Sequence, residues 1–160
     1  MASQYRLLDG PLSDSQLSDL AALFAREWWS TGRDIDEVRG IVDNSQVVVG
    51  VVDADTERLV AFARVVTDFS VFAVILDVIV DESIRGAGLG RQLMDAIFVD
   101  PRLQALRGIG LQCRPDLIPF YEKWGFSIKE VTPEASLQLT RRFDRDNGEI
   151  PASIVASARS

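Results

Sequence analysis

Apolar residues recur along the chain at two spacings, one typical of helices and one typical of strands. After Ser13, which forms a capping-box pattern with Gln16, apolar side chains return every three or four residues as far as Trp28. This spacing predicts a helix that ends near residues 30–32, with Trp28 on its buried stripe. Helical spacing predicts three more helices, over 35–42 with Asp34 as N-cap, 89–98 and 117–124.

Runs rich in β-branched residues predict the strands, which cover residues 4–8, 46–53, 59–67, 71–80, 108–113, 126–131 and 136–140. The run 71–80 is almost continuously apolar, as expected for a central strand that is covered on both faces. The order of elements predicts one α+β domain over residues 1–140, with a mixed sheet and helices on both faces. The charged, then small and polar residues 141–160 are expected to form a loosely packed C-terminal tail.

Composition and charge narrow the possible functions. Hydrophobic residues make up 47% and charged residues 26% of the 160 residues, which is ordinary for a globular domain. Lys and Arg number 17 against 24 Asp and Glu, a formal charge of −7. This balance argues against a nucleic-acid partner and mildly favours a cationic substrate. No apolar run approaches the roughly 20 residues that span a bilayer, and no signal peptide pattern opens the chain, so no membrane partner and a cytoplasmic location are expected.

The chain has no histidine and a single cysteine, Cys113. An internal disulfide and a Cys/His zinc site are therefore excluded, and no metal is expected. Ser–His and Cys–His nucleophiles are excluded for the same reason. Acid–base chemistry is left to carboxylates, tyrosine, lysine or water.

The most informative stretch is 78–94, where a β-branched strand turns through three glycines into an amphipathic helix. Glycines let the backbone approach a ligand closely, and the first amides of a helix favour a phosphate. A nucleoside-triphosphate loop is excluded because the chain has no Gly-Lys pair, and a dinucleotide loop would need a third glycine at Arg91. The pattern Arg-x-x-Gly-x-Gly does fit, at Arg85, Gly88 and Gly90. An ordinary tight turn is the alternative.

This loop resembles the coenzyme A pyrophosphate loop of the GNAT superfamily of N-acetyltransferases. Residues 119–126, Pro-Phe-Tyr-Glu-Lys-Trp-Gly-Phe, resemble the second signature segment of the same superfamily and follow the loop in the expected order. Residues 62–68, Phe-Ala-Arg-Val-Val-Thr-Asp, further resemble a bacterial subgroup. The resemblance covers nearly the whole chain, from about residue 5 to residue 140.

The resemblance implies a mixed, mostly antiparallel sheet of six to seven strands with about four helices on both faces, and acetyl transfer from acetyl-CoA to an amine in a ternary complex. In this superfamily the strand before the glycine loop separates from its neighbour, and pantetheine fills the gap. By position, the strand residues Val78, Ile79 and Val80 would contact pantetheine. The pyrophosphate would be held by Arg85, Gly86, Ala87, Gly88, Leu89, Gly90 and Arg91, unless the two arginine side chains are merely solvated charges. Arg114 stands where many members have an asparagine that contacts pantetheine.

The resemblance also assigns one catalytic role, and the residues themselves suggest others. It places Tyr121 beside the thioester sulfur as general acid, with core packing as the alternative role. Asp77 lies in an otherwise apolar strand, where an unpaired carboxylate is costly to bury. It is either the general base or an ion-pair partner of Arg64, which lies diagonal to it on the same sheet face. A covalent acetyl-cysteine at Cys113 is a further alternative to a small buried side chain there.

The acceptor is expected against the first two helices and their connection, where aromatic faces and carboxylates suit a cationic amine. Trp29, Glu27 and Arg64 are the predicted substrate contacts. Glu27 is also a weaker candidate for the base, with a solvated charge as its alternative. A small primary amine is the leading acceptor. Acetylation of protein N-termini or lysines, and a CoA-binding regulatory module without catalysis, are the alternatives. Homodimers are frequent in the superfamily.

Overall fold

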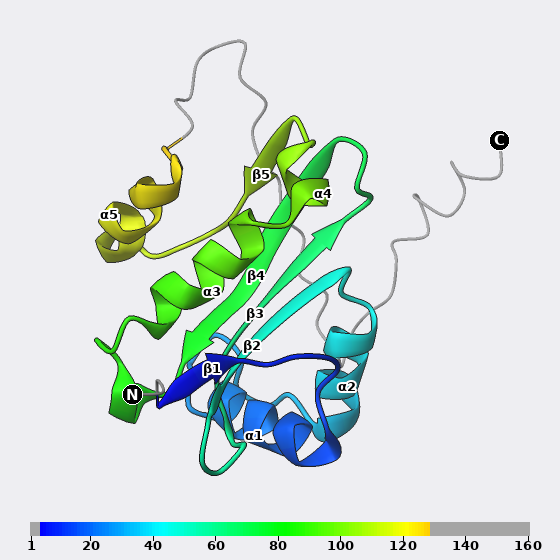
Figure 1. Cartoon of the computed structure of the whole chain (residues 1–160), viewed down its shortest axis with the longest axis vertical. Coiled ribbons are helices and arrows are strands. Elements are labelled where there is room, and N and C mark those ends of the chain that lie inside the picture. Colours follow the sequence, from blue (N-terminus) through cyan, green and yellow to red (C-terminus); the bar gives the residue numbers. More distant parts are fainter. Residues whose placement is uncertain (1–3, 129–160) are drawn as a thin grey trace, which may run out of the picture. The chain divides into compact units, whose positions relative to one another are not determined.

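The computed structural model describes residues 4–128, and in this part of the chain one sheet carries helices on both faces (Figure 1). The strands lie side by side in chain order: β1 (Tyr5–Leu7), β2 (Val47–Asp53), β3 (Leu59–Thr67), β4 (Phe72–Val80) and β5 (Gly108–Gly110). Neighbours among the first four strands are antiparallel, whereas β5 runs parallel to β4. The predicted α+β class with a mixed sheet is confirmed.

The helices of the described residues connect the strands. They are α1 (Asp14–Ala25), α2 (Ile35–Asp43), α3 (Leu89–Phe98), α4 (Pro101–Gln104) and α5 (Ile118–Tyr121), with short 3₁₀ helices η1 (Glu82–Ile84), η2 (Pro115–Leu117) and η3 (Glu122–Trp124). None of these helices has the length and apolar content that crossing a membrane requires.

Each face of the sheet buries a separate apolar core. On one face, α3 contributes Leu93, Met94 and Ile97, which pack against small and β-branched side chains of β3 and β4. On the other face, α1 and α2 cover Phe62 of β3, whose ring meets that of Phe24 edge to face at 6.1 Å between centroids. Burial of these side chains removes apolar area from water and fixes both helical layers on the sheet.

The predicted caps of the first two helices are confirmed. The Gln16 amide donates to Ser13 Oγ at 3.3 Å, and the Ser13 amide donates to Gln16 Oε1 at 3.0 Å. At α2, the Glu37 amide donates to Asp34 Oδ1 at 2.8 Å. Each bond satisfies an amide that the first turn of a helix leaves without an intrahelical acceptor.

The first helix ends earlier than predicted, and the burial predicted for Trp28 is wrong. The last residue of α1 is Ala25, and Trp28 is 74% exposed in the connection to α2. Ser30 Oγ donates to the Phe24 carbonyl at 2.7 Å, and Thr31 Oγ1 donates to the Glu27 carbonyl at 3.0 Å. These side-chain bonds stabilise a turn in place of further helix, so the apolar spacing no longer decides which residues face the core.

The numbers of strands and helices also differ from the prediction. The described part has five strands and five α-helices, against the six to seven strands and about four helices that were predicted. Residues 126–128, the described half of the predicted strand 126–131, are not in a strand. The other half, the predicted strand 136–140 and the predicted tail 141–160 lie outside the described residues. The predicted helix 117–124 is divided among η2, α5 and η3, because Pro119 lacks an amide hydrogen and Gly125 ends the last turn with φ +82°.

Candidate functional site

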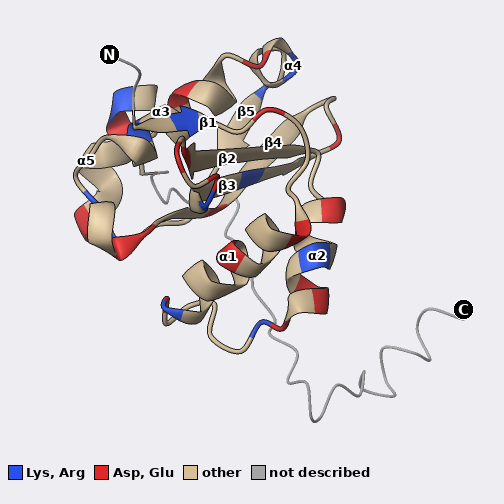
Figure 2. Cartoon of the chain, turned by 60° about the horizontal axis from the view of Figure 1, so that its bottom comes forward, with Lys and Arg blue, Asp and Glu red and all other residues tan. Residues whose placement is uncertain are grey.

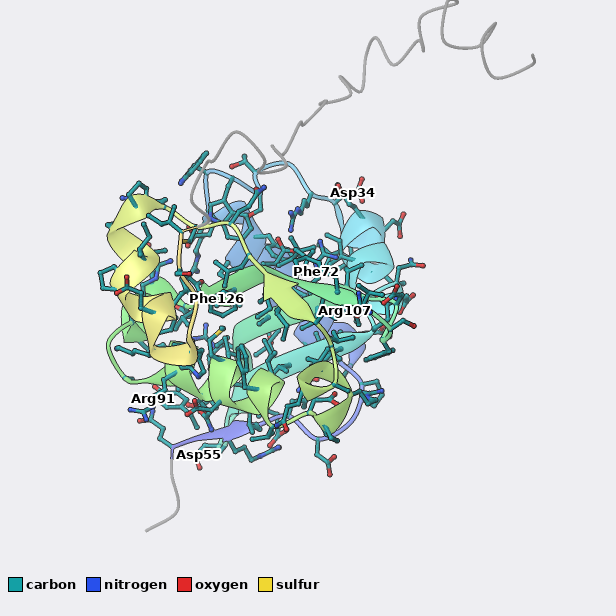
Figure 3. The ribbon with its side chains drawn as sticks, turned by 90° about the horizontal axis from the view of Figure 1, so that it is seen from above. Asp34, Asp55, Phe72, Arg91, Arg107 and Phe126 are labelled. Atoms are coloured by element: carbon teal, nitrogen blue, oxygen red, sulfur yellow. The ribbon has the colours of Figure 1, made fainter. Side chains whose placement is uncertain are left out.

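The sheet opens between its two parallel strands. Strand β5 pairs only with Phe72, Ala73 and Val74 at the start of β4, which continues for six more residues to Val80 (Figure 1). The Phe72 ring lies against β5, where a Cβ on Gly110 would stand 3.0 Å from it (Figure 3). Beyond Val74, no strand of the described residues pairs with this edge of β4. An unpaired strand edge can bind an extended ligand through main-chain hydrogen bonds.

The hydrogen bonds between β3 and β4 show which way the backbone groups at the end of β4 point. The Asp81 amide donates to the Val60 carbonyl of β3 at 2.8 Å. Backbone groups alternate between the two edges of a strand, so the groups of Val80 face the open edge. This is the orientation that the pantetheine contact predicted for Val80 requires.

A bulge interrupts β4 before this point. The register passes from Arg64↔Leu76 to Phe62↔Ile79, so Asp77 and Val78 together lie opposite Ala63. Asp77 has a φ of +53°, the left-handed region that few non-glycine residues adopt. Bulges re-aim side chains beside functional sites, and this one turns the Asp77 carboxylate toward two arginines.

Asp77 is buried in an ion-pair cluster. Its Oδ2 accepts from Arg64 Nε at 2.6 Å, its Oδ1 accepts from Arg33 at 3.2 Å, and only 5% of its side chain is exposed. The predicted ion pair with Arg64 is therefore confirmed, whereas the role of Asp77 as a base stays a prediction. The contact with Arg33 was not predicted, because Arg33 lies 44 residues earlier in a connection without periodicity.

The glycine loop has free amides and left-handed glycines. Gly86 and Gly88 have φ values of +90° and +83°, and a Cβ on either would meet no atom within 4 Å. Their requirement for glycine is therefore conformational. Gly90 differs, because its Cβ would stand 3.3 Å from the Phe120 ring of the second motif.

Few of the loop amides donate within the described residues. The Ala87 amide donates to the Ile84 carbonyl, and the first helical bond runs from Gln92 to Gly88. Within residues 4–128, no acceptor bonds to the amides of Gly86, Gly88, Leu89, Gly90 and Arg91. Such amides at the positive end of a helix dipole suit a diphosphate.

The two loop arginines point to different partners. Arg91 projects outward from the first turn of α3 (Figure 3), with 74% of its side chain exposed, and pairs with Asp95 at 3.5 Å. Asp95 also accepts from the Trp124 indole at 2.9 Å, which joins α3 to the second motif. The Arg85 guanidinium instead contacts Glu27 and donates from Nε to the Val80 carbonyl at 3.2 Å. Phosphate contacts of both side chains stay predictions.

Tyr121 ends α5 as a buried phenol. Its ring packs edge to face on Phe120, with centroids 4.9 Å apart, and the side chain is 7% exposed. Burial, with a smaller contribution from Cys113, raises the pKa of Tyr121 to about 12. The phenol therefore stays protonated at every ordinary pH and can donate a hydrogen bond.

Cys113 follows β5 on the way to η2. Cys113 is exposed, so the small buried side chain expected there is wrong. Its remaining desolvation, with the nearby charge of Asp116, raises the pKa of its thiol. A higher pKa lowers the thiolate fraction at neutral pH, which disfavours a nucleophilic role. Arg114, in the position of the usual asparagine, pairs with Asp116 at 3.0 Å.

The connection between α1 and α2 supplies the remaining predicted residues. Trp29 is 37% exposed, and its ring meets Phe24 edge to face at 6.2 Å. The Arg33 guanidinium lies 4.4 Å from the Phe24 ring centroid. Acidic residues mark both helices beside this connection (Figure 2). This connection combines exposed aromatic surface with carboxylates, and the substrate contacts of Trp29, Glu27 and Arg64 stay predictions.

A strand edge that leads into a loop of amides without acceptors in the described part of the chain defines a class of site, one that can bind an extended ligand with a diphosphate. Residues 43–128, more than half of the chain, match the family described as the acetyltransferase (GNAT) domain. The chain belongs to this GNAT family of acetyltransferases, as its two motifs predicted.

Relatives and solved structures agree with this assignment. A protein of Prochlorococcus marinus, named uncharacterized N-acetyltransferase ycf52-like, is 30% identical over 128 residues, which cover 79% of this chain and 71% of that protein. Serotonin N-acetyltransferase 2, chloroplastic, of Oryza sativa subsp. japonica is 34% identical over 98 residues, which cover 60% of this chain and only 49% of the rice protein. A crystal structure of an acetyltransferase from Deinococcus radiodurans has a TM-score of 0.70 at 26% identity, with 94% of this chain and 96% of that chain covered.

Proposed function

We propose that the protein transfers the acetyl group of acetyl-CoA to a primary amine, and that the acceptor is a small cationic molecule. The observation that carries the proposal is the edge of β4 after Val74, which no strand of the described residues pairs with and which leads directly into the loop of free amides. A strand edge suits the extended, amide-containing pantetheine arm, and the loop suits its diphosphate. The strand edge and the loop are adjacent, so one ligand can bind to both.

The cofactor contacts follow from this arrangement. The main chain of Val78 and Val80, on either side of Ile79, lines the pantetheine path. The amides of Gly86, Gly88, Leu89 and Gly90 hold the pyrophosphate, with Ala87 as the turn between the glycines. Arg91, which is exposed at the first turn of α3, adds a charge-assisted contact.

Acetyl-CoA supplies an activated acetyl group, and Tyr121 assists the departure of the sulfur. A thiol has an ordinary pKa of about 8.5, whereas the pKa of Tyr121 is raised to about 12. Complete proton transfer to such a thiolate would be uphill by roughly 5 kcal/mol. The apolar surroundings that raise the pKa of the phenol also raise that of the sulfur. Tyr121 therefore acts as a hydrogen-bond donor that passes its proton as the carbon–sulfur bond breaks.

Asp77 is better suited to holding the bulge than to taking a proton. A general base needs an oxygen within reach of the substrate proton, and both Asp77 oxygens accept from arginine. We therefore assign Asp77, Arg33 and Arg64 to the support of the bulged strand on which the thioester rests.

The acceptor enters from the side of the α1–α2 connection. Trp28 and Trp29 expose aromatic surface there, which suits a cationic and aromatic amine. The name of the rice relative gives serotonin as its acceptor, so serotonin is the first amine to test. The retained Tyr121 disfavours a CoA-binding module without catalysis.

The test is the release of thiol from acetyl-CoA with a panel of amines: serotonin, tyramine, a polyamine, an amino sugar and a lysine peptide. Wild-type protein should release thiol with at least one small amine, and Tyr121→Phe should lower kcat by about 100-fold with little change in the KM for acetyl-CoA. Acceptor-dependent release with the peptide alone would favour protein acetylation. No acceptor-dependent release with any member of the panel would reject the proposal.

A further inference from the structure

The side chain of Arg85 leaves the loop to which its backbone belongs. Its NH2 group contacts Glu27 Oε1, and its Nε donates to the Val80 carbonyl at 3.2 Å. Glu27 lies 58 residues earlier, two residues after the end of α1, and 18% of its side chain is exposed. One guanidinium thus joins the open edge of β4 to the acceptor side of the molecule.

Both ends of this link are held in place. The Glu27 carbonyl accepts from the Ser30 amide at 3.1 Å and from Thr31 Oγ1 at 3.0 Å. At the other end, the Val80 carbonyl faces the open edge of β4, because the next residue, Asp81, bonds to Val60 of β3. The Glu27 backbone is therefore fixed, and the Arg85 guanidinium holds its carboxylate beside the route along which the acetyl group must arrive.

Glu27 differs from the other carboxylates next to this part of β4. Both oxygens of Asp77 accept from arginine. In Asp81, Oδ1 accepts from Ser83 and Oδ2 accepts from Arg58 at 3.1 Å. In Glu27, only Oε1 has a recorded contact among the described residues. Its other oxygen can accept from a substrate.

We propose that Glu27 receives the ammonium group of the acceptor and that Arg85 is a positioning residue for Glu27 rather than a phosphate ligand. This inference rests on the proposed function. The acceptor loses two protons from nitrogen overall as its bond to the acetyl carbon forms and the carbon–sulfur bond breaks. Glu27 takes one proton and releases it to solvent. The sulfur receives a proton from Tyr121. The second proton that leaves the nitrogen then reprotonates Tyr121 through water.

The test combines steady-state kinetics with CoA binding measured by calorimetry. Glu27→Gln and Arg85→Ala should each raise the amine KM by about tenfold, the effect of losing one charged contact of roughly 1.4 kcal/mol. Glu27→Gln should also lower kcat by about 100-fold, because it removes the group that takes the proton. The double variant should have an amine KM no higher than that of the poorer single variant, because both changes disrupt the same Glu27–Arg85 pair. Arg85→Lys should recover much of the amine KM. The Kd for CoA should change by less than about threefold in these variants and rise in Arg91→Ala.

Charge reversal distinguishes an acceptor contact of Glu27 from an ion pair that only links the end of α1 to the loop. In the double variant Glu27→Arg/Arg85→Glu the ion pair can form again, but an arginine then faces the ammonium. We expect no recovery of the amine KM, and full recovery would overturn the inference. The matched control is Glu57→Gln, which removes the exposed Arg6–Glu57 pair and should leave every constant unchanged.

The calorimetric measurement does not depend on turnover. A loss of CoA affinity in Arg85→Ala equal to that in Arg91→Ala would identify Arg85 as a phosphate ligand and overturn the inference. This outcome is distinct from failure of the proposed function, which is a wild-type protein that binds CoA but releases no thiol with any amine.

Discussion

Burial controls the chemistry of Tyr121, whose pKa is raised from 10.0 to about 12. The phenol of the unfolded chain ionises near pH 10, so between pH 10 and 12 the folded protein holds the proton that the unfolded chain has lost. Its contribution to stability is complete below pH 10 and disappears as the pH rises through 12. We expect the free energy of unfolding to fall by about 3 kcal/mol more over this window in wild type than in Tyr121→Phe. Urea unfolding at several alkaline pH values measures this, and identical pH dependences would contradict it.

The buried carboxylate of Asp77 gives a second prediction. Asp77→Asn leaves Arg33 and Arg64, whose side chains are 20% and 17% exposed, without their shared anion. Removing one member of a buried ion pair costs about 3 kcal/mol or more. We expect a loss of this size in urea unfolding, and removal of one arginine as well, in Asp77→Asn/Arg33→Met, should recover part of it. If Asp77 is the general base, Asp77→Asn will instead abolish turnover at nearly unchanged stability.

Among the elements, the turn from β4 into α3 depends most on backbone conformation. Gly88 caps α3 with φ +83° and has open space around the position of a Cβ. Gly88→Ala adds no clash, but a left-handed alanine costs about 1–2 kcal/mol. Relief of that strain would turn the loop amides away from the pyrophosphate. We therefore expect the Kd for acetyl-CoA to rise by about tenfold in calorimetry.

Gly40→Ala is the matched control for this substitution. Gly40 lies inside α2, and its Cβ would also meet nothing within 4 Å. Alanine there should stabilise the protein by about 1 kcal/mol, because it favours helix, without changing the Kd for acetyl-CoA. Equal effects of the two substitutions on the Kd would show that the loop conformation is not what binds the cofactor.

For several elements, the local sequence pattern is sufficient to predict where they begin and end. The strands β2, β3 and β4 and the helices α2 and α3 lie within about one residue of their predicted positions, since each has a long apolar period or a clear cap. The end of α1 could not be predicted, because Ser30 and Thr31 bond to backbone carbonyls that a longer helix would have used. The short β5 reflects the parallel register with β4 and the Phe72 ring packed on it, neither of which is a local property.

For the whole molecule, the formal charge of −7 predicts how salt acts on the acceptor. A negative surface attracts a cationic amine at long range, and raising the salt from about 0.01 M to 0.15 M shortens the screening length from roughly 30 Å to 8 Å. We expect kcat/KM for a cationic amine to fall several-fold over this range. An aromatic amine that is neutral at the assay pH is the control and should respond much less. A rise for the cationic amine would contradict the prediction.

The sequence by itself determined the α+β class, the glycine loop, the second motif and the family, because caps, periodicity and motifs depend on residues that are close along the chain. The tertiary structure alone decided that Trp28 is exposed, that Arg33 joins Arg64 on Asp77, and that Arg85 contacts Glu27. These contacts join residues 44 and 58 positions apart. They depend on where the sheet register and the bulge in β4 place each side chain, and no local spacing encodes that placement.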